Sequence, residues 1–168
     1  MGIAVRRAER KDAKVLAKII VESWAAAYGN LLPKEELEKY LDEEKRRQQF
    51  VRFLDQEELI FLGFVHGEPF GFIFGGLEHE EGDPRLTSIY SLYLRQEFWG
   101  QGLGKPLLEA MVTSLQEKGA KDVRLWVFEE NKRARAFYEK HGFVLTGEVK
   151  KSRFSNGAME VSYGKTLI

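Results

Sequence analysis

The sequence predicts one α/β domain built on a mixed, mostly antiparallel, twisted sheet of about seven strands flanked by about four helices. Short apolar stretches with the alternation of strands are interleaved with longer stretches whose apolar residues recur every three or four positions. Interleaving of this kind is typical of the α/β class. The 168 residues contain no linker, repeat or low-complexity tract, so we expect residues 1–168 to form a single domain.

The N-terminal half supplies three strands and two helices. They are expected at 3–7 (strand), 11–27 (helix), 33–54 (helix), 59–65 (strand) and 70–77 (strand). Asp12 is expected to cap or charge the first helical turn, and Gly29-Asn30 ends that helix. Pro33 opens the second helix. His66-Gly67 is a hairpin turn signal between the last two strands.

The C-terminal half alternates strands and helices after an acidic loop at 78–84. The expected elements are 87–94 (strand), 102–118 (helix), 123–128 (strand), 131–140 (helix), 143–149 (strand) and 159–167 (strand). Gly119 is the C-terminal stop of the first of these helices, and His141-Gly142 ends the second. The last two strands are expected to close the sheet in antiparallel fashion.

Composition narrows the function classes. Lys and Arg together number 26, as do Asp and Glu, and this balance argues against a dedicated nucleic-acid binder. There is no cysteine, which excludes disulfides, thiolate metal sites and a cysteine nucleophile. No apolar run resembles a signal peptide or a membrane span, so we expect a cytoplasmic protein with no membrane contact. His66, His79 and His141 are isolated in the sequence, and no metal site is expected.

A glycine-rich turn precedes the helix at 102–118. Gly100, Gly102 and Gly104 alternate with other residues, and Lys105 follows. Bare backbone at a helix N-terminus suits a phosphate group, because the first N–H groups are unpaired and carry partial positive charge. The spacing fits neither the P-loop nor the dinucleotide fingerprint, since Pro106 follows the lysine and the third glycine comes too early. A turn that merely starts a helix remains an alternative.

A second constellation follows at the helix of 131–140. Asn131 is a good N-cap, and Ala134 and Tyr138 lie on its side of the helix. A capping amide and a phenol therefore point the same way.

These two segments resemble the GCN5-related N-acetyltransferase (GNAT) superfamily. Its signature [Q/R]-x-x-G-x-[G/A] matches Trp99 to Gly104, except that Trp99 stands at the first position. Its later segment is matched by Asn131, Ala134, Phe137, Tyr138, Gly142 and Phe143. The order of elements agrees along nearly the whole chain, and the resemblance implies an acetyl-CoA-dependent N-acetyltransferase.

The resemblance also implies site residues. The backbone at Leu92, Tyr93 and Leu94 would pair with the pantetheine arm, as an added strand does. Cofactor contacts are further implied for Trp99, Gly100, Gln101, Gly102, Leu103, Gly104, Lys105, Asn131, Ala134, Phe137 and Tyr138. The amides of 100–105 would hold the pyrophosphate, and the Trp99 departure puts one side-chain phosphate contact in doubt.

Tyr138 is our candidate for the general acid that protonates the departing CoA sulfur, with half-buried packing as its alternative reading. A backbone N–H near Leu92 is the candidate donor to the thioester carbonyl oxygen. No acid lies in the strand at 87–94, so the general base stays open between Glu22, Glu78, His79 and a water chain.

The resemblance implies a small-molecule or peptide amine as acceptor. Trp24 and Tyr28 share a helix face and could line its slot or pack in the core. Glu78 belongs to the acidic loop, which could attract a cationic amine. The strand before the glycines and the closing GKTLI are similar to bacterial polyamine acetyltransferases, and a homodimer is possible by family analogy. Two other hypotheses stay open: a CoA-binding regulatory module without turnover, and a nucleotide-dependent enzyme.

Overall fold

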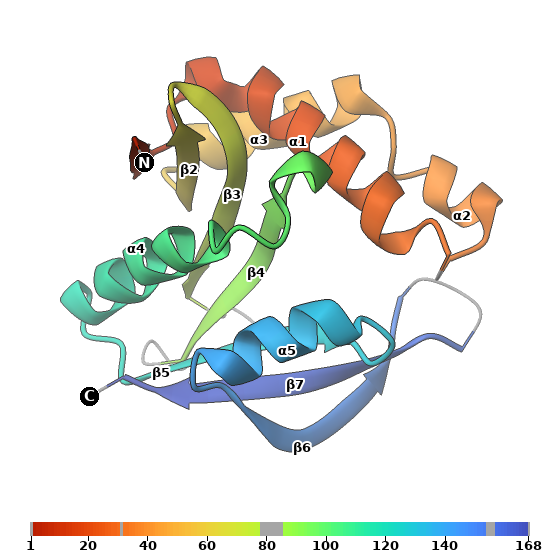
Figure 1. The fold of residues 1–168 in the computed structure, drawn as a ribbon, viewed down its shortest axis with the longest axis vertical. Helices are drawn as coiled ribbons and strands as arrows, with labels where there is room; N and C mark the ends of the chain where they lie inside the picture. The colour runs from red at the N-terminus through yellow and green to blue at the C-terminus, as the bar shows by residue number, and fades with distance from the viewer. Residues whose placement is uncertain (1, 31, 78–85, 154–156, 168) are drawn as a thin grey trace.

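The chain folds around one seven-stranded sheet in the computed structural model, which describes residues 2–30, 32–77, 86–153 and 157–167 (Figure 1). The strands are β1 (Ile3–Arg7), β2 (Leu59–Val65), β3 (Glu68–Leu77), β4 (Leu86–Leu94), β5 (Asp122–Phe128), β6 (Val144–Lys151) and β7 (Met159–Thr166). Their order in the sheet is β1-β2-β3-β4-β5-β7-β6. Every neighbouring pair is antiparallel except β4 and β5, so the predicted mixed sheet is confirmed.

The described residues form five α-helices around the sheet, where about four were predicted. They are α1 (Ala13–Tyr28), α2 (Lys34–Glu38), α3 (Glu43–Asp55), α4 (Gly104–Glu117) and α5 (Lys132–Lys140), with short 3-10 turns at η1 (Arg10–Asp12) and η2 (Gln96–Phe98). Figure 1 shows α1, α2 and α3 in the upper part of the view and α5, β6 and β7 in the lower part.

The extra helix comes from the segment 33–54, which is two helices and not one. The side chain of Asp42 accepts a hydrogen bond from the N–H of Lys45 at 3.1 Å and caps α3. An N-cap residue has non-helical backbone angles, as Asp42 does, so the helix is interrupted between α2 and α3. The Asp42-Glu43-Glu44 run is the sequence signal for this start.

Asp12 stands at the N-cap position of α1 but makes no side-chain cap hydrogen bond to that helix. It forms a capping box with Glu9 in the η1 turn that leads into α1, so the prediction that it caps or charges the first helical turn is confirmed only in part. Its carboxylate accepts from Arg6 Nη1 at 2.7 Å and from the Glu9 N–H at 2.7 Å. The Asp12 side chain is buried, and the guanidinium lowers the pKa of this carboxyl against the opposing effect of desolvation. The residue therefore joins β1 to the start of the helical segment and satisfies the Glu9 N–H at its terminus.

Two apolar clusters lie on opposite faces of the sheet. α4 and α5 contribute Leu107, Met111 and Tyr138 to one cluster, and α1 and α3 contribute Leu16, Ile19 and Phe50 to the other. Successive residues of a strand contribute to different clusters, since Ile73 packs in the first cluster and Phe72 in the second.

The sheet separates in its middle. β4 pairs with β5 at only four positions, from Leu86↔Asp122 to Ile89↔Leu125. β4 runs on to Leu94 and β5 to Phe128 without pairing to each other. A β-bulge at Tyr90, where β4 pairs with β3, coincides with the point of separation. Backbone groups on the facing edges of both strands are thereby left open in the middle of the sheet.

Candidate active site

A cleft of about 1700 Å³ lies where β4 and β5 separate. Its walls come from both sides of the gap: Leu92, Tyr93 and Leu94 on β4, and Trp126, Val127 and Phe128 on β5. The remaining walls are the glycine turn, α5, α1 and α3, with the end of β6. Segments distant in sequence therefore meet at one cavity.

Most of the sequence-predicted site residues line this cleft. They are Trp24, Tyr28, Leu92, Tyr93, Leu94, Trp99, Gly100, Gly102, Leu103, Gly104, Lys105, Asn131, Ala134, Phe137 and Tyr138. Gln101 does not, because its side chain turns back and donates to the Glu97 carbonyl at 2.9 Å. Glu78 and His79 lie outside the described residues.

The glycine turn presents bare backbone to the cleft. Gly100 and Gly102 have φ values of 74° and 76°, in the left-handed region that glycine tolerates best. A Cβ added at either position would meet nothing within 4 Å, so open space lies beside both residues. Of the described backbone hydrogen bonds outside helices and strands, none is donated by residues 100–105. These free N–H groups, with the N-terminus of α4 behind them, suit a phosphate.

Gly104 has a different role from the two glycines before it. A Cβ at Gly104 would lie 2.9 Å from the Phe137 ring. The missing side chain lets α5 pack directly against the start of α4. This contact fixes the start of α4 against α5, and residues of both line the cleft.

Trp99 joins the glycine turn to both walls. Its indole N–H donates to the Leu94 carbonyl at 2.8 Å, at the end of β4. Across the cleft, the guanidinium carbon of Arg133 lies 3.6 Å from the centre of a Trp99 ring. Arg133, which the sequence reasoning missed, thus places a cation beside the glycine turn. Its position in the first turn of a helix predicted to face the glycines is the signal that could have found it.

Asn131 and Tyr138 stand on α5. The Asn131 Oδ1 atom accepts from the Ala134 N–H at 3.2 Å, which confirms the predicted cap and leaves the Nδ2 group for other contacts. Tyr138 is only 7% exposed but reaches the cleft. Burial, with the nearby Tyr93, raises the pKa of Tyr138 well above that of an ordinary phenol. The hydroxyl is therefore protonated at neutral pH.

The wall formed by α1 and α3 is aromatic. Trp24 and Tyr28 meet at 4.9 Å between ring centres, as their spacing predicted. The Tyr28 and Tyr93 hydroxyls lie 3.4 Å apart. Burial raises the pKa of both phenols, and neighbouring groups add to the shift at Tyr28. Trp24 and Tyr28 belong to the α1–α3 cluster, which confirms the core-packing alternative, and they also line the cleft, where contact with an acceptor stays a prediction.

Glu22 is held away from this chemistry. Its carboxylate accepts from Arg95 Nε at 3.1 Å, and it is not a cleft residue. Glu22 is therefore not placed to act as the general base. Among described residues no cluster of potential metal ligands occurs, and no described helix is long and apolar enough to cross a membrane.

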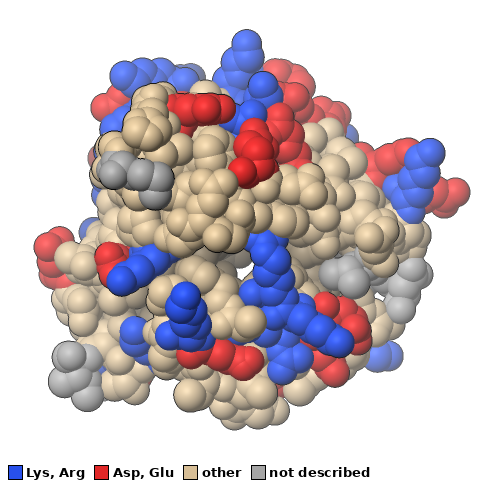
Figure 2. Space-filling model, in the orientation of Figure 1, with Lys and Arg blue, Asp and Glu red and all other residues tan. Residues whose placement is uncertain are grey.

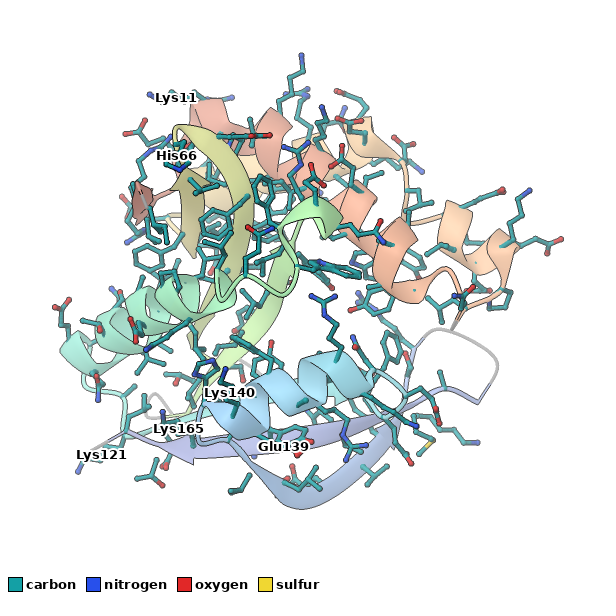
Figure 3. The ribbon with its side chains drawn as sticks, in the orientation of Figure 1. Lys11, His66, Lys121, Glu139, Lys140 and Lys165 are labelled. Atoms are coloured by element: carbon teal, nitrogen blue, oxygen red, sulfur yellow. The ribbon has the colours of Figure 1, made fainter. Side chains whose placement is uncertain are left out.

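The cleft is basic although the chain is neutral. Among the described lining residues the cations are Arg46, Lys105, Arg133, Lys140, Lys150, Lys151 and Arg153, and the acids are Glu58 and Glu160. Figure 2 shows Lys and Arg side chains gathered around a hollow at the centre of one face. In Figure 3, Lys140 lies at the end of α5, and Glu139 lies below the helix toward β7, where it accepts from the Tyr163 hydroxyl at 3.4 Å. The positive field favours an anionic ligand.

Comparison with known proteins agrees with this geometry. Residues 18–143 match the Acetyltransferase (GNAT) family. The spermidine N(1)-acetyltransferase of Thermoplasma acidophilum is 28% identical over 150 residues, covering 86% of this chain and 90% of that protein. The N-acetyltransferase YuaI of Bacillus subtilis is 30% identical over 134 residues, covering 77% and 73%.

Solved structures share the fold. The PaiA N-acetyltransferase of Thermoplasma acidophilum, in complex with coenzyme A, superposes with a TM-score of 0.75 at 24% identity, over 96% of this chain and 98% of that one. An N-acetyltransferase of Staphylococcus aureus gives a TM-score of 0.79 at 17% identity, with both chains fully covered. Fold, enzyme class and acetyl-CoA cofactor are as the two motifs implied. The chain belongs to the GNAT family of acetyltransferases.

Proposed function

We propose that the single domain of residues 1–168 transfers an acetyl group directly from acetyl-CoA to a primary amine held in the β4–β5 cleft. The neutral amine nitrogen attacks the thioester carbon, the C–S bond breaks, and the nitrogen loses one proton while the thiolate gains one. The products are an N-acetylated amine and CoA thiol. One observation carries the proposal: the open edge of β4, the glycine turn and Tyr138 all face the same cleft.

The residues present fit acetyl-CoA, which supplies the activated acetyl group. The edge of β4 beyond Ile89 does not pair with β5 and offers backbone groups to the amides of a pantetheine arm, except at the Leu94 carbonyl, which accepts from Trp99 and Ser23. The amides of Gly100 to Lys105 would receive the pyrophosphate. Arg133, stacked on Trp99, would supply the phosphate contact that the departure at Trp99 put in doubt. A backbone N–H near Leu92 would donate to the thioester carbonyl oxygen.

Tyr138 is proposed to donate a proton to the CoA sulfur. Its raised pKa keeps the hydroxyl protonated over the working pH range. The same shift makes Tyr138 a weak acid in the free protein, so the proton moves only as negative charge develops on sulfur. Glu22 is engaged by Arg95, and Glu58, Glu160 and His141 are the described lining residues that could accept a proton. We propose that water in the open cleft takes the proton of the amine.

The test is a thiol-release assay with acetyl-CoA and a panel of primary amines, comparing wild type with Tyr138→Phe. We expect kcat to fall about 100-fold or more, because general acid catalysis is lost. The Kd of acetyl-CoA should change less than about tenfold, since one hydrogen bond at most is removed. Tyr163→Phe is the matched control: it removes a buried phenol that contacts Arg135 and Glu139 outside the cleft.

The pH profile gives an independent readout. Wild-type activity should rise with pH as the amine loses its proton and should not decline below about pH 10, the ordinary phenol pKa, because the pKa of Tyr138 is raised. Full activity in the Phe variant would refute the acid role and leave the acetyltransferase intact. Tight acetyl-CoA binding without turnover on any amine would instead favour the regulatory module.

A further inference from the structure

Arg46 is a cation of α3 that is partly buried in the aromatic wall of the cleft. Its Nε donates to the Tyr40 carbonyl at 3.1 Å, and Nη1 donates to Gln49 Oε1 at 3.3 Å. The guanidinium carbon lies 5.3 Å from a ring centre of Trp24 and 5.7 Å from that of Tyr40. The Nη2 atom is buried and has no hydrogen-bond partner.

Arg6 and Arg95 differ from Arg46 in having carboxylate partners. Arg6 pairs with the buried Asp12 at 2.7 Å, and Arg95 contacts the carboxylates of Glu22, Glu68 and Glu97. No described carboxylate pairs with Arg46. Desolvation lowers the pKa of its guanidinium. Burying a cation without a counter-ion costs free energy of folding. An anion that binds beside the cation offsets this cost.

Arg46 stands at the acceptor end of the cleft and not at the glycine turn. The Arg46 guanidinium carbon lies 5.3 Å from a ring centre of Trp24, the Trp24 ring lies 4.9 Å from that of Tyr28, and the Tyr28 hydroxyl lies 3.4 Å from the hydroxyl of Tyr93. The Tyr93 ring belongs to the α1–α3 wall, next to Tyr28. A ligand that runs along Tyr93 therefore has one end near the proposed transfer point and the other near Arg46.

We propose that Arg46 binds a carboxylate of the acceptor, so that the acceptor is a free amino acid whose amino group is acetylated. This inference rests on the proposed function. A guanidinium is a good match for a carboxylate, and the stacked rings of Trp24 and Tyr40 hold it in place. The positive field of Arg153 adds to this preference, and Glu160 and Glu58 are the described acids at the cleft. A polyamine would bring only positive charge to this end.

The experiment measures thiol release with matched acceptor pairs. Each amino acid with an apolar or aromatic side chain is compared with its decarboxylated amine, for example phenylalanine with 2-phenylethylamine, and spermidine is included. In wild type we expect kcat/KM for the best amino acid to exceed that of its amine by at least about tenfold, the effect of one charge-assisted hydrogen bond. Arg46→Gln should abolish this difference, mainly by raising the KM of the amino acid, and Arg46→Lys should retain part of it.

Arg47→Gln is the matched control, because Arg47 is its neighbour on α3 and pairs with Glu44. It should keep the wild-type preference. Equal rates on the two members of each pair, or a preference for spermidine, would overturn the inference and leave the proposed function standing. An equal loss on both members in Arg46→Gln would make the residue structural and also overturn it. No thiol release with any amine would remove the proposed function itself. The comparison of each amino acid with its amine in the wild-type protein tests the inference even if the Arg46→Gln variant does not fold.

Discussion

At the scale of single residues, Trp99 and Arg133 show how a departure from a motif is accommodated. The signature expects a polar side chain at position 99, and the chain has a tryptophan there. The indole N–H binds the Leu94 carbonyl and its ring supports Arg133 from the opposite wall. The cation beside the glycine turn is therefore supplied by α5, which a motif read position by position does not reveal.

Arg133→Gln should raise the Kd of acetyl-CoA about tenfold or more, because a charge-assisted contact to phosphate is lost. Binding of S-acetylpantetheine, which has no pyrophosphate, should not change. Titration calorimetry at two salt concentrations measures both, and the loss should be smaller at high salt. Lys132→Gln removes a neighbouring exposed cation outside the cleft and is the control. Equal weakening of both ligands would assign Arg133 to folding and not to phosphate.

At the scale of elements, the α4–α5 contact depends on the absence of a side chain at Gly104. The three glycines were recognised in the sequence, but their different roles were not. Those roles depend on which residues lie close to each glycine in the folded protein. Gly100 and Gly102 need their backbone conformation, whereas Gly104 needs room for Phe137. Element positions were predictable because apolar periodicity is local. The α2–α3 break was missed because one capping side chain overrode that periodicity.

Gly104→Ala should lower the free energy of unfolding by about 1–3 kcal/mol, the usual cost of inserting a methyl group into close packing. Urea unfolding monitored by circular dichroism measures it. Adding Phe137→Leu, which shortens the opposing ring, should restore part of the loss. Gly102→Ala is the control, because its cost comes from a φ of 76° and not from contact, so Phe137→Leu should not rescue it. Rescue of both variants would contradict the packing explanation.

At the scale of the whole molecule, two halves of the sheet meet through a short seam. The four paired positions between β4 and β5 join the β1–β4 part to the β5–β7 part. The strand order could be anticipated only through the family resemblance, and the early end of the seam depends on a bulge that no local pattern marks. Similarly, Arg46 of α3 and Trp24 of α1 come together through tertiary packing, so their proximity could not be read from the chain.

Acetyl-CoA should slow amide hydrogen exchange in β4 beyond Ile89, because the pantetheine arm would occupy its open edge. Exchange followed by mass spectrometry, with and without the cofactor, measures the effect by segment. Peptides from β1 and β2, which are paired along their length and lie away from the cleft, are the internal control. Protection confined to the glycine turn would argue that the cofactor does not pair with β4.

The brevity of the β4–β5 pairing should make the lifetime of the protein in a cell depend on its cofactor. A ligand that binds only the folded form shifts the balance between folded and unfolded chains by mass action. If acetyl-CoA completes the middle of the sheet, the pool of that metabolite also determines how often the two halves come apart. Proteases act on unfolded chains. A low acetyl-CoA concentration would therefore shorten the lifetime of the enzyme as well as deprive it of substrate.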